Sequence, residues 1–406
     1  MKQGKSTKDQ EKGEEHSHIK RSTGILRILS FLCILFTVVF YSHFREFLNS
    51  LSTTKDIDYY HRSHVHVCQQ RAVNVAFLKV HKTGGTTVSN ILLRYGDSRG
   101  LNIALPKLNS PKWNYLGFNT ILQRDRIFPI PPTETYNILC NHAIYSRNSF
   151  RELLGADVVN IGIIREPVSQ FVSAAHFFGL LRELQFKLKI KNKSELISKF
   201  SKNPNLCPDL LKIYMHNRMS FDFGLEAKDF DNETAIDEFL RSLDKDFALV
   251  IVTEYFDESL VLLKRILCMN LKDILYIPLN VNTRKKREPI IVSEEDKFNI
   301  RQYNHADLKL YQYFKDELIK QLQQSGNNIN NEIQNFKSIH KSVIHFCNER
   351  KSEKFSNSKV FEIEETIWND NFTVTTRECE IMMEYEFKTV KRLTKKAEAK
   401  FKIWKR

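Results

Sequence analysis

The chain has 406 residues, of which 42% are hydrophobic and 11% aromatic, and this composition excludes an intrinsically disordered protein for most of the length. Lys and Arg outnumber Asp and Glu by 62 to 48, a balance that suits an anionic partner such as a nucleic acid, an acidic membrane or a phosphorylated cofactor. The length allows one large domain with appendages or two smaller domains.

The N-terminal region is expected to anchor the chain in a membrane. Residues 25–44 form the one stretch apolar enough to cross a bilayer, and Lys and Arg residues lie near its amino end. The positive-inside rule then leaves residues 1–24 as a cytosolic tail and places the rest in the lumen, as in a single-pass type II protein with a signal anchor. A cleaved signal peptide or a buried core helix remains the alternative. Residues 45–71 are polar and without clear periodicity, which indicates a stem.

Six of the seven cysteines lie beyond the apolar stretch and would partly pair in an oxidising lumen, although the sequence does not decide which ones. They are Cys68, Cys140, Cys207, Cys268, Cys347 and Cys379. The chain has no CxxC motif and no Cys/His spacing typical of zinc, so no metal is expected. Sequons for N-glycosylation begin at Asn192, Asn232 and Asn371.

Three apolar segments of strand type, each followed by a helical pattern, indicate the fold class. The segments are residues 72–80, 157–164 and 247–253, and the helical patterns cover residues 86–95, 168–178 and 255–269. Strands that are apolar on both faces and alternate with helices are typical of a parallel sheet covered by helices. Pro167 suits the first position of its helix, where a missing N–H costs nothing. We therefore predict an α/β fold with a central parallel sheet flanked by helices.

The loop after the first strand, HKTGGTT, joins a buried strand to the start of a helix. Such a junction collects backbone N–H groups and the positive end of the helix dipole, and it binds a phosphate or sulfate. Gly84 and Gly85 let the backbone approach the anion closely. Lys82 adds a positive charge, and Thr86 and Thr87 add hydroxyl donors. The Walker A spacing is absent because the lysine precedes the glycines, which argues against a kinase or ATPase.

Arg165 and Ser173 supply a second candidate anion site. Arg165 follows the second strand directly, and the carboxyl ends of parallel strands form the crevice in which such sheets bind ligands. Ser173 lies about two helical turns further along. Each feature taken alone is also compatible with a structural role. Together with the glycine-rich loop, they describe a ligand with anionic groups at both ends.

These segments resemble a known family. KTGGTT (82–87) resembles the 5′-phosphosulfate loop of sulfotransferases, and Arg165 with Ser173 resembles their 3′-phosphate pair. Between residues 73 and 330, four segments are similar to the galactose 3-O-sulfotransferases, including the galactosylceramide sulfotransferases: FLKVHKTGGTTVSNILLRYG (77–96), REPVSQFVSAAHFF (165–178), FDFGL (221–225) and EYFDESLVLLKRILCMNLKDILYIPLN (254–280). Gly85 departs from the Ser that is usual at its position.

The resemblance implies a Golgi enzyme with a P-loop-like sulfotransferase fold. Its reaction would move sulfate from 3′-phosphoadenosine 5′-phosphosulfate (PAPS), a co-substrate, to the 3-hydroxyl of a β-galactosyl residue on a glycolipid or glycoprotein glycan. Lys82 would steady charge on the bridging oxygen, and backbone donors would hold the sulfuryl oxygens. The residues implied in binding PAPS are Lys82, Thr83, Gly84, Gly85, Thr86, Thr87, Arg165 and Ser173.

A base for the acceptor hydroxyl is expected at His142, which follows an apolar stretch and resembles the family's His-x-x-aromatic segment. Ile144 stands where that segment usually has Arg, which bears on contacts with the acceptor. His81 and His176 are the alternative bases.

Residues 72–335 are expected to form the catalytic domain, and residues 336–406 a basic C-terminal extension. The run NVNTRKKR (280–287) is expected either to close over the nucleotide or to be a solvated run of charge. The run 388–406 is expected to be solvated surface, with a membrane contact as the alternative and no nucleic acid partner. Two other functions stay open: sulfation of a charged glycosaminoglycan, and glycan binding without catalysis by a protein that keeps the fold.

Overall fold

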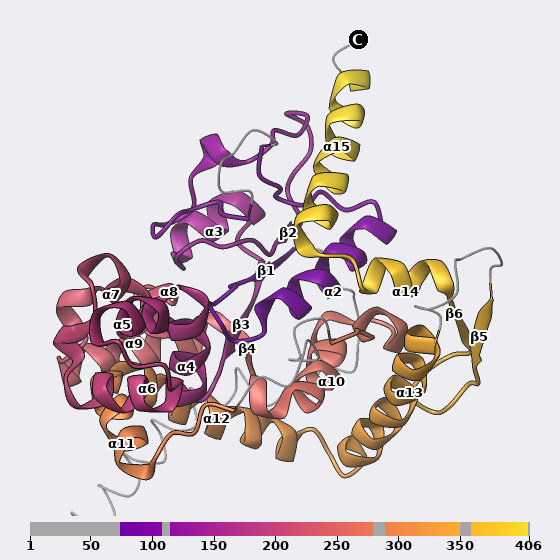
Figure 1. Ribbon diagram of the computed structural model, residues 1–406. Coiled ribbons are helices and arrows are strands. Elements are labelled where there is room, and N and C mark those ends of the chain that lie inside the picture. Colours follow the sequence, from indigo (N-terminus) through magenta and orange to yellow (C-terminus); the bar gives the residue numbers. More distant parts are fainter. Residues whose placement is uncertain (1–73, 108–113, 279–288, 350–358, 405–406) are drawn as a thin grey trace, which may run out of the picture. The chain divides into compact units, whose positions relative to one another are not determined.

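The computed structural model describes residues 74–107, 114–278, 289–349 and 359–404, all within one compact unit (Figure 1). The predicted membrane anchor at residues 25–44 lies outside these ranges, as do the cytosolic tail, the stem and the basic run 280–287. Within the described ranges, no helix combines the length and the apolar character needed to cross a bilayer.

A parallel sheet of four strands forms the centre, in the order β2-β1-β3-β4. The strands are β1 Val75–Phe77, β2 Ile138–Leu139, β3 Val159–Ile164 and β4 Phe247–Val252. Val75 lies opposite Ile138 on one side and Val159 on the other, and Ile161 lies opposite Leu249. Nearly every residue of these strands is buried, because helices cover both faces. The predicted α/β fold with a central parallel sheet is confirmed.

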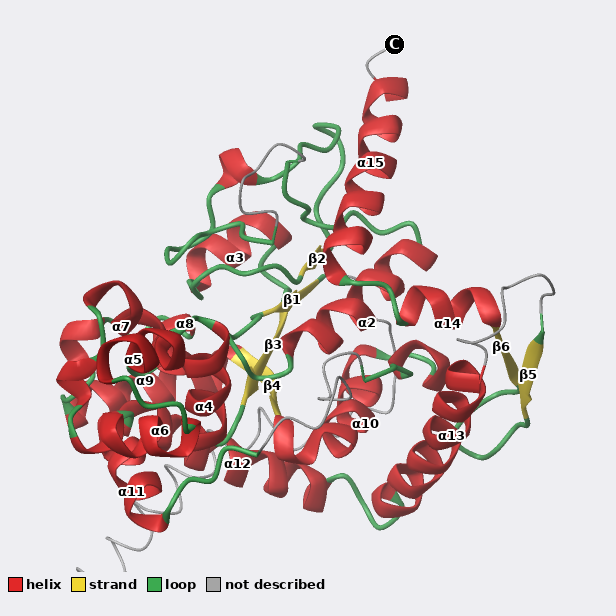
Figure 2. Cartoon of the chain, in the orientation of Figure 1, coloured by secondary structure: helices red, strands yellow, loops and turns green. Residues whose placement is uncertain are grey.

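Helices make up most of the remaining described residues (Figure 2). They are α2 Gly85–Ser98, α3 Arg147–Leu154, α4 Pro167–Phe177, α5 Leu180–Leu188, α6 Lys193–Lys202, α7 Asp209–Met215, α8 Arg218–Asp222, α9 Glu233–Asp246, α10 Phe256–Leu267, α11 Glu294–Tyr303, α12 His305–Gln324, α13 Ile329–Glu349, α14 Thr376–Met382 and α15 Glu386–Trp404. Short 3-10 turns lie at Arg124–Arg126, Pro204–Leu206, Ala227–Asp229, Thr253–Tyr255 and Leu271–Ile274. Strands β5 Val360–Ile363 and β6 Phe372–Thr375 form an antiparallel pair.

The predicted helices correspond to α2, α4 and α10. Pro167 is the first residue of α4, as predicted, and the Glu166 side chain caps the helix by accepting a hydrogen bond from the Ser169 N–H at 2.8 Å. A second apolar cluster, which includes the stacked rings of Phe171 and Phe200, joins α4 to α6. This packing fixes the direction in which α4 leaves the sheet.

The C-terminal residues pack on the same core as the sheet. Helix α13 continues through residue 335, where we place the end of the catalytic domain, and Phe336 is fully buried in the cluster that contains Val75. A disulfide between Cys347 and Cys379 ties α13 to α14. Cys268 is also disulfide-bonded, whereas Cys140 and Cys207 are free and buried.

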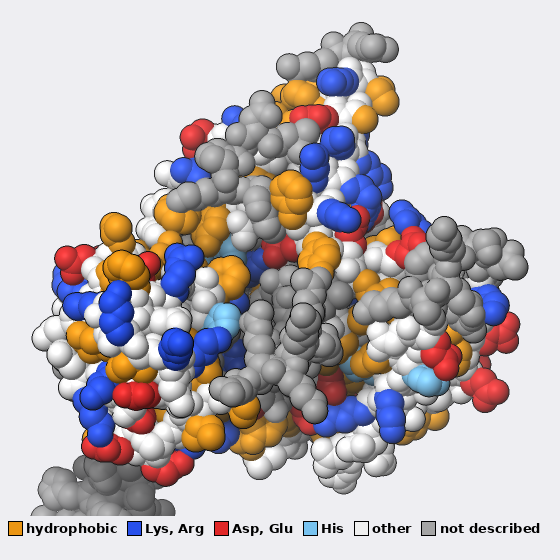
Figure 3. Space-filling view, viewed as in Figure 1, with side chains coloured by type: hydrophobic (Ala, Val, Ile, Leu, Met, Phe, Trp, Pro, Cys, Tyr) orange, Lys and Arg blue, Asp and Glu red, His pale blue; other side chains and the backbone are white. Residues whose placement is uncertain are grey.

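The basic helix α15 is partly neutralised by acidic residues of the predicted catalytic domain. Lys and Arg side chains gather along it in the space-filling view (Figure 3). Arg392 and Lys396 pair with Asp97 at 3.0 and 2.5 Å, and Lys400 pairs with Glu134 at 2.7 Å. Part of the run 388–406 therefore has a specific structural partner, whereas we expect solvated charge from the sequence.

Candidate active site

The carboxyl ends of the four parallel strands bring the predicted site residues to one edge of the sheet. Strand β1 leads into the loop 79–84, β2 into His142, β3 into Arg165 and β4 into Thr253. This edge is where open parallel sheets bind their ligands. The structure thus brings four segments that are far apart in the sequence to the same edge of the sheet.

The loop between β1 and α2 is shaped to receive an anion. Thr83 is fully buried, its hydroxyl donates to the Val80 carbonyl at 3.0 Å, and Thr253 Oγ1 lies 2.5 Å from its carbonyl oxygen. Gly84 adopts a left-handed backbone with φ 89° and precedes α2, whose first N–H groups have no side-chain cap. Uncapped N–H groups at the start of a 14-residue helix can bind a phosphate or sulfate.

Lys82 and Arg165 form a pair of neighbouring cations beside that helix start. Arg165 Nη1 donates to the Lys82 carbonyl at 3.3 Å, and the Lys82 ammonium lies 3.9 Å from the centre of the Phe177 ring. Burial lowers the pKa of Lys82, and the charge of Arg165 lowers it further. Neither cation forms a salt bridge with a carboxylate in the described part of the chain. Two half-buried like charges held close together favour a bound anion.

Ser173 and Thr87 are half-buried, and their hydroxyls have no hydrogen-bond partner among the described residues. Ser173 lies on α4, which begins two residues after Arg165. Thr86 differs from the expectation, because its hydroxyl donates to the carboxylate of Glu386 at 3.3 Å instead of facing an open site. The roles predicted for these residues towards a ligand remain predictions.

The ring of His142 is fixed in one tautomer. Its Nδ1 lies 2.8 Å from the carbonyl oxygen of Lys79, which can only accept, so Nδ1 carries the hydrogen and Nε2 presents the lone pair. The ring stacks on His81 at 4.2 Å and on Tyr115 at 4.9 Å between centroids. Burial lowers the pKa of His142 well below its usual value, and the neighbouring His81 and Lys79 lower it further. This neutral imidazole has the form that a general base requires.

His81, one of the alternative bases, is bound at both ring nitrogens. Nδ1 donates to Asp222 Oδ2 at 2.7 Å, and Nε2 accepts from the Tyr115 hydroxyl at 2.9 Å. The buried Arg218 binds the other oxygen of Asp222 at 2.7 Å. Burial lowers the pKa of His81 in spite of the nearby Asp222. His81 therefore has no lone pair open to a substrate, and the other alternative, His176, lies exposed on the last turn of α4.

Five residues of this site were not assigned a role from the sequence. Asp222 lies within the FDFGL segment and Lys79 within FLKVHK, so the resemblance marks both segments without giving these side chains a function. The remaining three are Tyr115, Arg218 and Glu386, and no motif in the sequence indicates them.

The sequence of the chain is similar to those of known proteins. The sequence model of the family described as galactose-3-O-sulfotransferase matches residues 8–362. Human galactosylceramide sulfotransferase is 31% identical over 263 residues, which are 64% of this chain and 60% of that protein. Galactose-3-O-sulfotransferase 3 of Bos taurus is 29% identical over 63% of this chain and 58% of its own length. For galactose-3-O-sulfotransferase 2 of Mus musculus, the identity is 28% over 68% of this chain and 69% of the relative. The chain thus spans about 60% of the length of the galactosylceramide sulfotransferase it matches.

Proposed function

Because the chain belongs to the galactose-3-O-sulfotransferase family, we propose that it transfers sulfate from PAPS to the 3-hydroxyl of a β-galactosyl residue on a glycolipid or glycoprotein glycan. The observation that carries this proposal is the pair Lys82 and Arg165, two adjacent cations that form no salt bridge with a carboxylate in the described chain, beside the uncapped start of α2. A sulfate donor with phosphate at both ends of its ribose satisfies both features.

The described residues fit PAPS as the co-substrate. The N–H groups of α2 and the Lys82 ammonium suit the 5′-phosphosulfate, and the guanidinium of Arg165 with the open hydroxyl of Ser173 suits the 3′-phosphate. The left-handed Gly84 carries no side chain that would separate the anion from the backbone.

Transfer then requires a base and a group that stabilises the leaving oxygen. His142 Nε2 takes the proton of the acceptor hydroxyl while that oxygen bonds to sulfur. The bond between sulfur and the bridging phosphate oxygen breaks in the same displacement, and adenosine 3′,5′-bisphosphate leaves. Lys82 stabilises the negative charge that develops on this oxygen, and the N–H groups of α2 hold the sulfuryl oxygens.

The proposal includes residence in the Golgi membrane, with residues 25–44 as a type II anchor and the catalytic domain in the lumen. The disulfide between Cys347 and Cys379 supports an oxidising compartment.

The test is the transfer of labelled sulfate from PAPS by the full chain in detergent micelles. The acceptors are galactosylceramide, lactose-type glycans and a glycosaminoglycan, and binding of adenosine 3′,5′-bisphosphate is measured by calorimetry. We expect label on galactosides only, at the 3-hydroxyl. Label on the glycosaminoglycan alone would indicate a different acceptor class. Binding of the bisphosphate without transfer to any acceptor would favour a non-catalytic protein, and the absence of binding would refute the proposal.

A further inference from the structure

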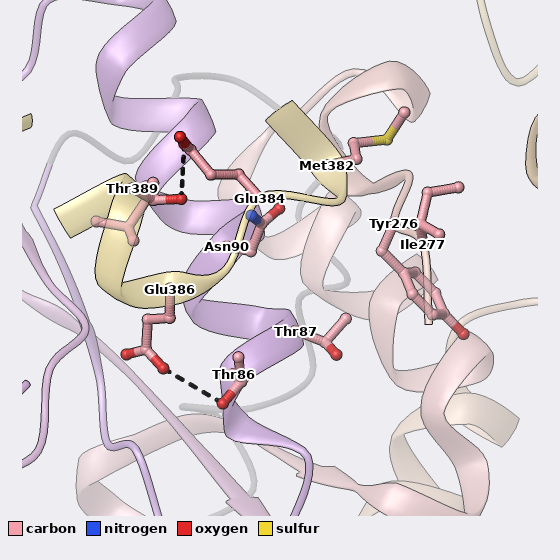
Figure 4. Close-up of a pocket in the computed structure, with 10 residues that line it drawn as sticks. Thr86, Thr87, Asn90, Tyr276, Ile277, Met382, Glu384, Glu386 and Thr389 are labelled. Atoms are coloured by element: carbon pink, nitrogen blue, oxygen red, sulfur yellow. Dashed lines mark hydrogen bonds between the residues drawn. The ribbon is translucent and has the colours of Figure 1, made fainter. Parts of the chain in front are cut away.

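Glu386, the first residue of α15, contacts the loop between β1 and α2, which forms part of the candidate site. Its carboxylate forms an ion pair with the Lys79 ammonium. It also accepts a hydrogen bond from Thr86 Oγ1 at 3.3 Å (Figure 4). The side chains of Lys79 and Glu386 are only 3% and 10% exposed. Lys79 precedes the turn of the loop and Thr86 follows it, so one carboxylate clamps both ends of the turn.

Lys79 also connects this clamp to the candidate base. Its carbonyl oxygen is the acceptor that fixes the tautomer of His142. Its aliphatic stem runs against the start of α2, since a Cβ added at Gly85 would lie 3.1 Å from Lys79 Cγ. A shift of Lys79 would therefore disturb both the N–H groups of α2 and the orientation of His142.

The segment that carries Glu386 is held firmly against α2. Asn90 of α2 donates to the carbonyl of Ile381 at 3.3 Å. Across the turn between α14 and α15, the Glu384 carboxylate accepts from Thr389 Oγ1 at 2.9 Å (Figure 4). The ion pairs of α15 with Asp97 and Glu134 add attachments further along the helix. The position of Glu386 is thus set by its own segment and not only by its contacts in the loop.

A carboxylate beside an anion site needs a specific explanation, because it repels a phosphosulfate. The pairing with Lys79 removes that difficulty, since the two charges cancel. Lys79 in turn is a buried cation that requires a partner. The ion pair therefore stabilises the loop without adding net charge to the site.

We propose that Glu386 is a positioning residue of the active site, which neutralises Lys79 and, through Lys79 and Thr86, holds the phosphosulfate loop and His142 in the geometry for sulfuryl transfer. The inference rests on the function proposed above. Residue 386 lies beyond the residues 8–362 that match the family, so the C-terminal segment completes a site whose other parts lie within the match.

The test compares Glu386→Gln with Glu380→Gln in the full chain. Gln keeps the size of the side chain but leaves Lys79 buried and unpaired. Glu380 lies on α14 and pairs with the exposed Arg377, so the same substitution there provides a matched control. The turnover of each protein is divided by the number of sites that bind adenosine 3′,5′-bisphosphate, which removes the effect of any unfolded fraction.

We expect Glu386→Gln to lower turnover per binding site on the order of tenfold or more, and Glu380→Gln to leave it unchanged. Adding Lys79→Met removes the unpaired charge, so the double variant should lose less than the product of the two single losses. Turnover per binding site equal to wild type would overturn the inference. A gain in turnover would also overturn it, because it would mean that Glu386 blocks the site. Losses that multiply in the double variant would overturn it as well.

Two further measurements keep the test decisive. If Glu386→Gln does not fold, Glu386→Asp keeps the charge but shortens the reach, and the same loss per binding site is expected. Hydrogen exchange of the loop amides 79–87 is independent of any acceptor, and we expect faster exchange in the Glu386 variants than in Glu380→Gln. Unchanged exchange in the Glu386 variants would overturn the inference. Faster exchange in these variants, together with a wild-type protein that transfers no sulfate, would contradict the proposed function alone.

Discussion

Two lysines and two histidines of the site divide into an anchored pair, Lys79 and His81, and an open pair, Lys82 and His142. Lys79, His81 and His142 are all buried, but only the anchored residues hold a carboxylate, Lys79 that of Glu386 and His81 that of Asp222. The open residues contact aromatic rings instead, and in the described chain neither one pairs with a carboxylate.

Because two lysines and two histidines differ in this way, residue type alone does not assign a role at this site. A carboxylate cancels the charge of an anchored lysine or accepts the N–H of an anchored histidine. The anchored residue then stabilises the fold and is not available to a ligand. A residue without a carboxylate keeps its charge or its lone pair available to a ligand.

The largest effect is expected at His142, which presents the open lone pair. Without a base, His142→Ala should lower turnover by about 10²–10⁴-fold. The affinity for adenosine 3′,5′-bisphosphate, measured by calorimetry, should stay near that of the wild type because the phosphate contacts remain. Sulfate transfer at the wild-type rate would move the base to another residue.

Lys82→Met should lower turnover by about 10²–10³-fold, since it removes a charge from the developing leaving group. Lys79→Met is the matched control, which should lower the thermal unfolding temperature more and the turnover less. A larger loss of turnover in Lys79→Met, with a larger loss of thermal stability in Lys82→Met, would contradict the division into anchored and open lysines.

His81→Gln should act mainly on stability. The substitution leaves Asp222 and the Tyr115 hydroxyl with poorer partners, at a cost of about 1–3 kcal/mol in the free energy of unfolding. Urea denaturation measures this loss, and turnover should fall by less than about tenfold. A larger loss of turnover without a loss of stability would place His81 among the groups that contact substrate.

The smallest effect is expected from mild acid. The base acts in its neutral form, and the pKa of His142 lies well below the usual 6.5, so protonation removes activity only at a pH well under that value. Between pH 7 and about 6, kcat/KM should therefore change by less than about twofold. A steep fall centred near 6.5 would indicate a base with an unperturbed pKa.

The sequence predicted those features that local patterns encode. Runs of apolar residues indicated β1, β3 and β4 with the helices that follow them, and the loop at Gly84 and Gly85 lies between strand and helix as expected. Strand β2 has only two residues, too few for a periodic pattern, although it delivers His142 to the site. The predicted placement of Lys82 and Arg165 at one edge followed from the parallel arrangement of strands, whereas His142 was proposed from the resemblance of its segment to the family.

The remaining features depend on contacts between distant residues. Asp222 meets His81 across 141 positions of the chain, and Glu386 meets Thr86 across 300. No local sequence pattern distinguishes a paired glutamate such as Glu386 from a solvated glutamate in the same basic helix. Three basic residues of α15, Arg392, Lys396 and Lys400, likewise pair with Asp97 and Glu134, which the helix reaches only in the folded protein.

The pairing of Lys79 with Glu386 also bears on how the protein is made. The two residues are 307 positions apart, and a ribosome synthesises Lys79 long before its partner. During that interval the nascent chain can pair its strands, but the buried lysine still lacks its carboxylate. Helix α15 thus completes the loop that follows β1, so a chain released before Glu386 would contain every residue that matches the family and still lack one contact of the site.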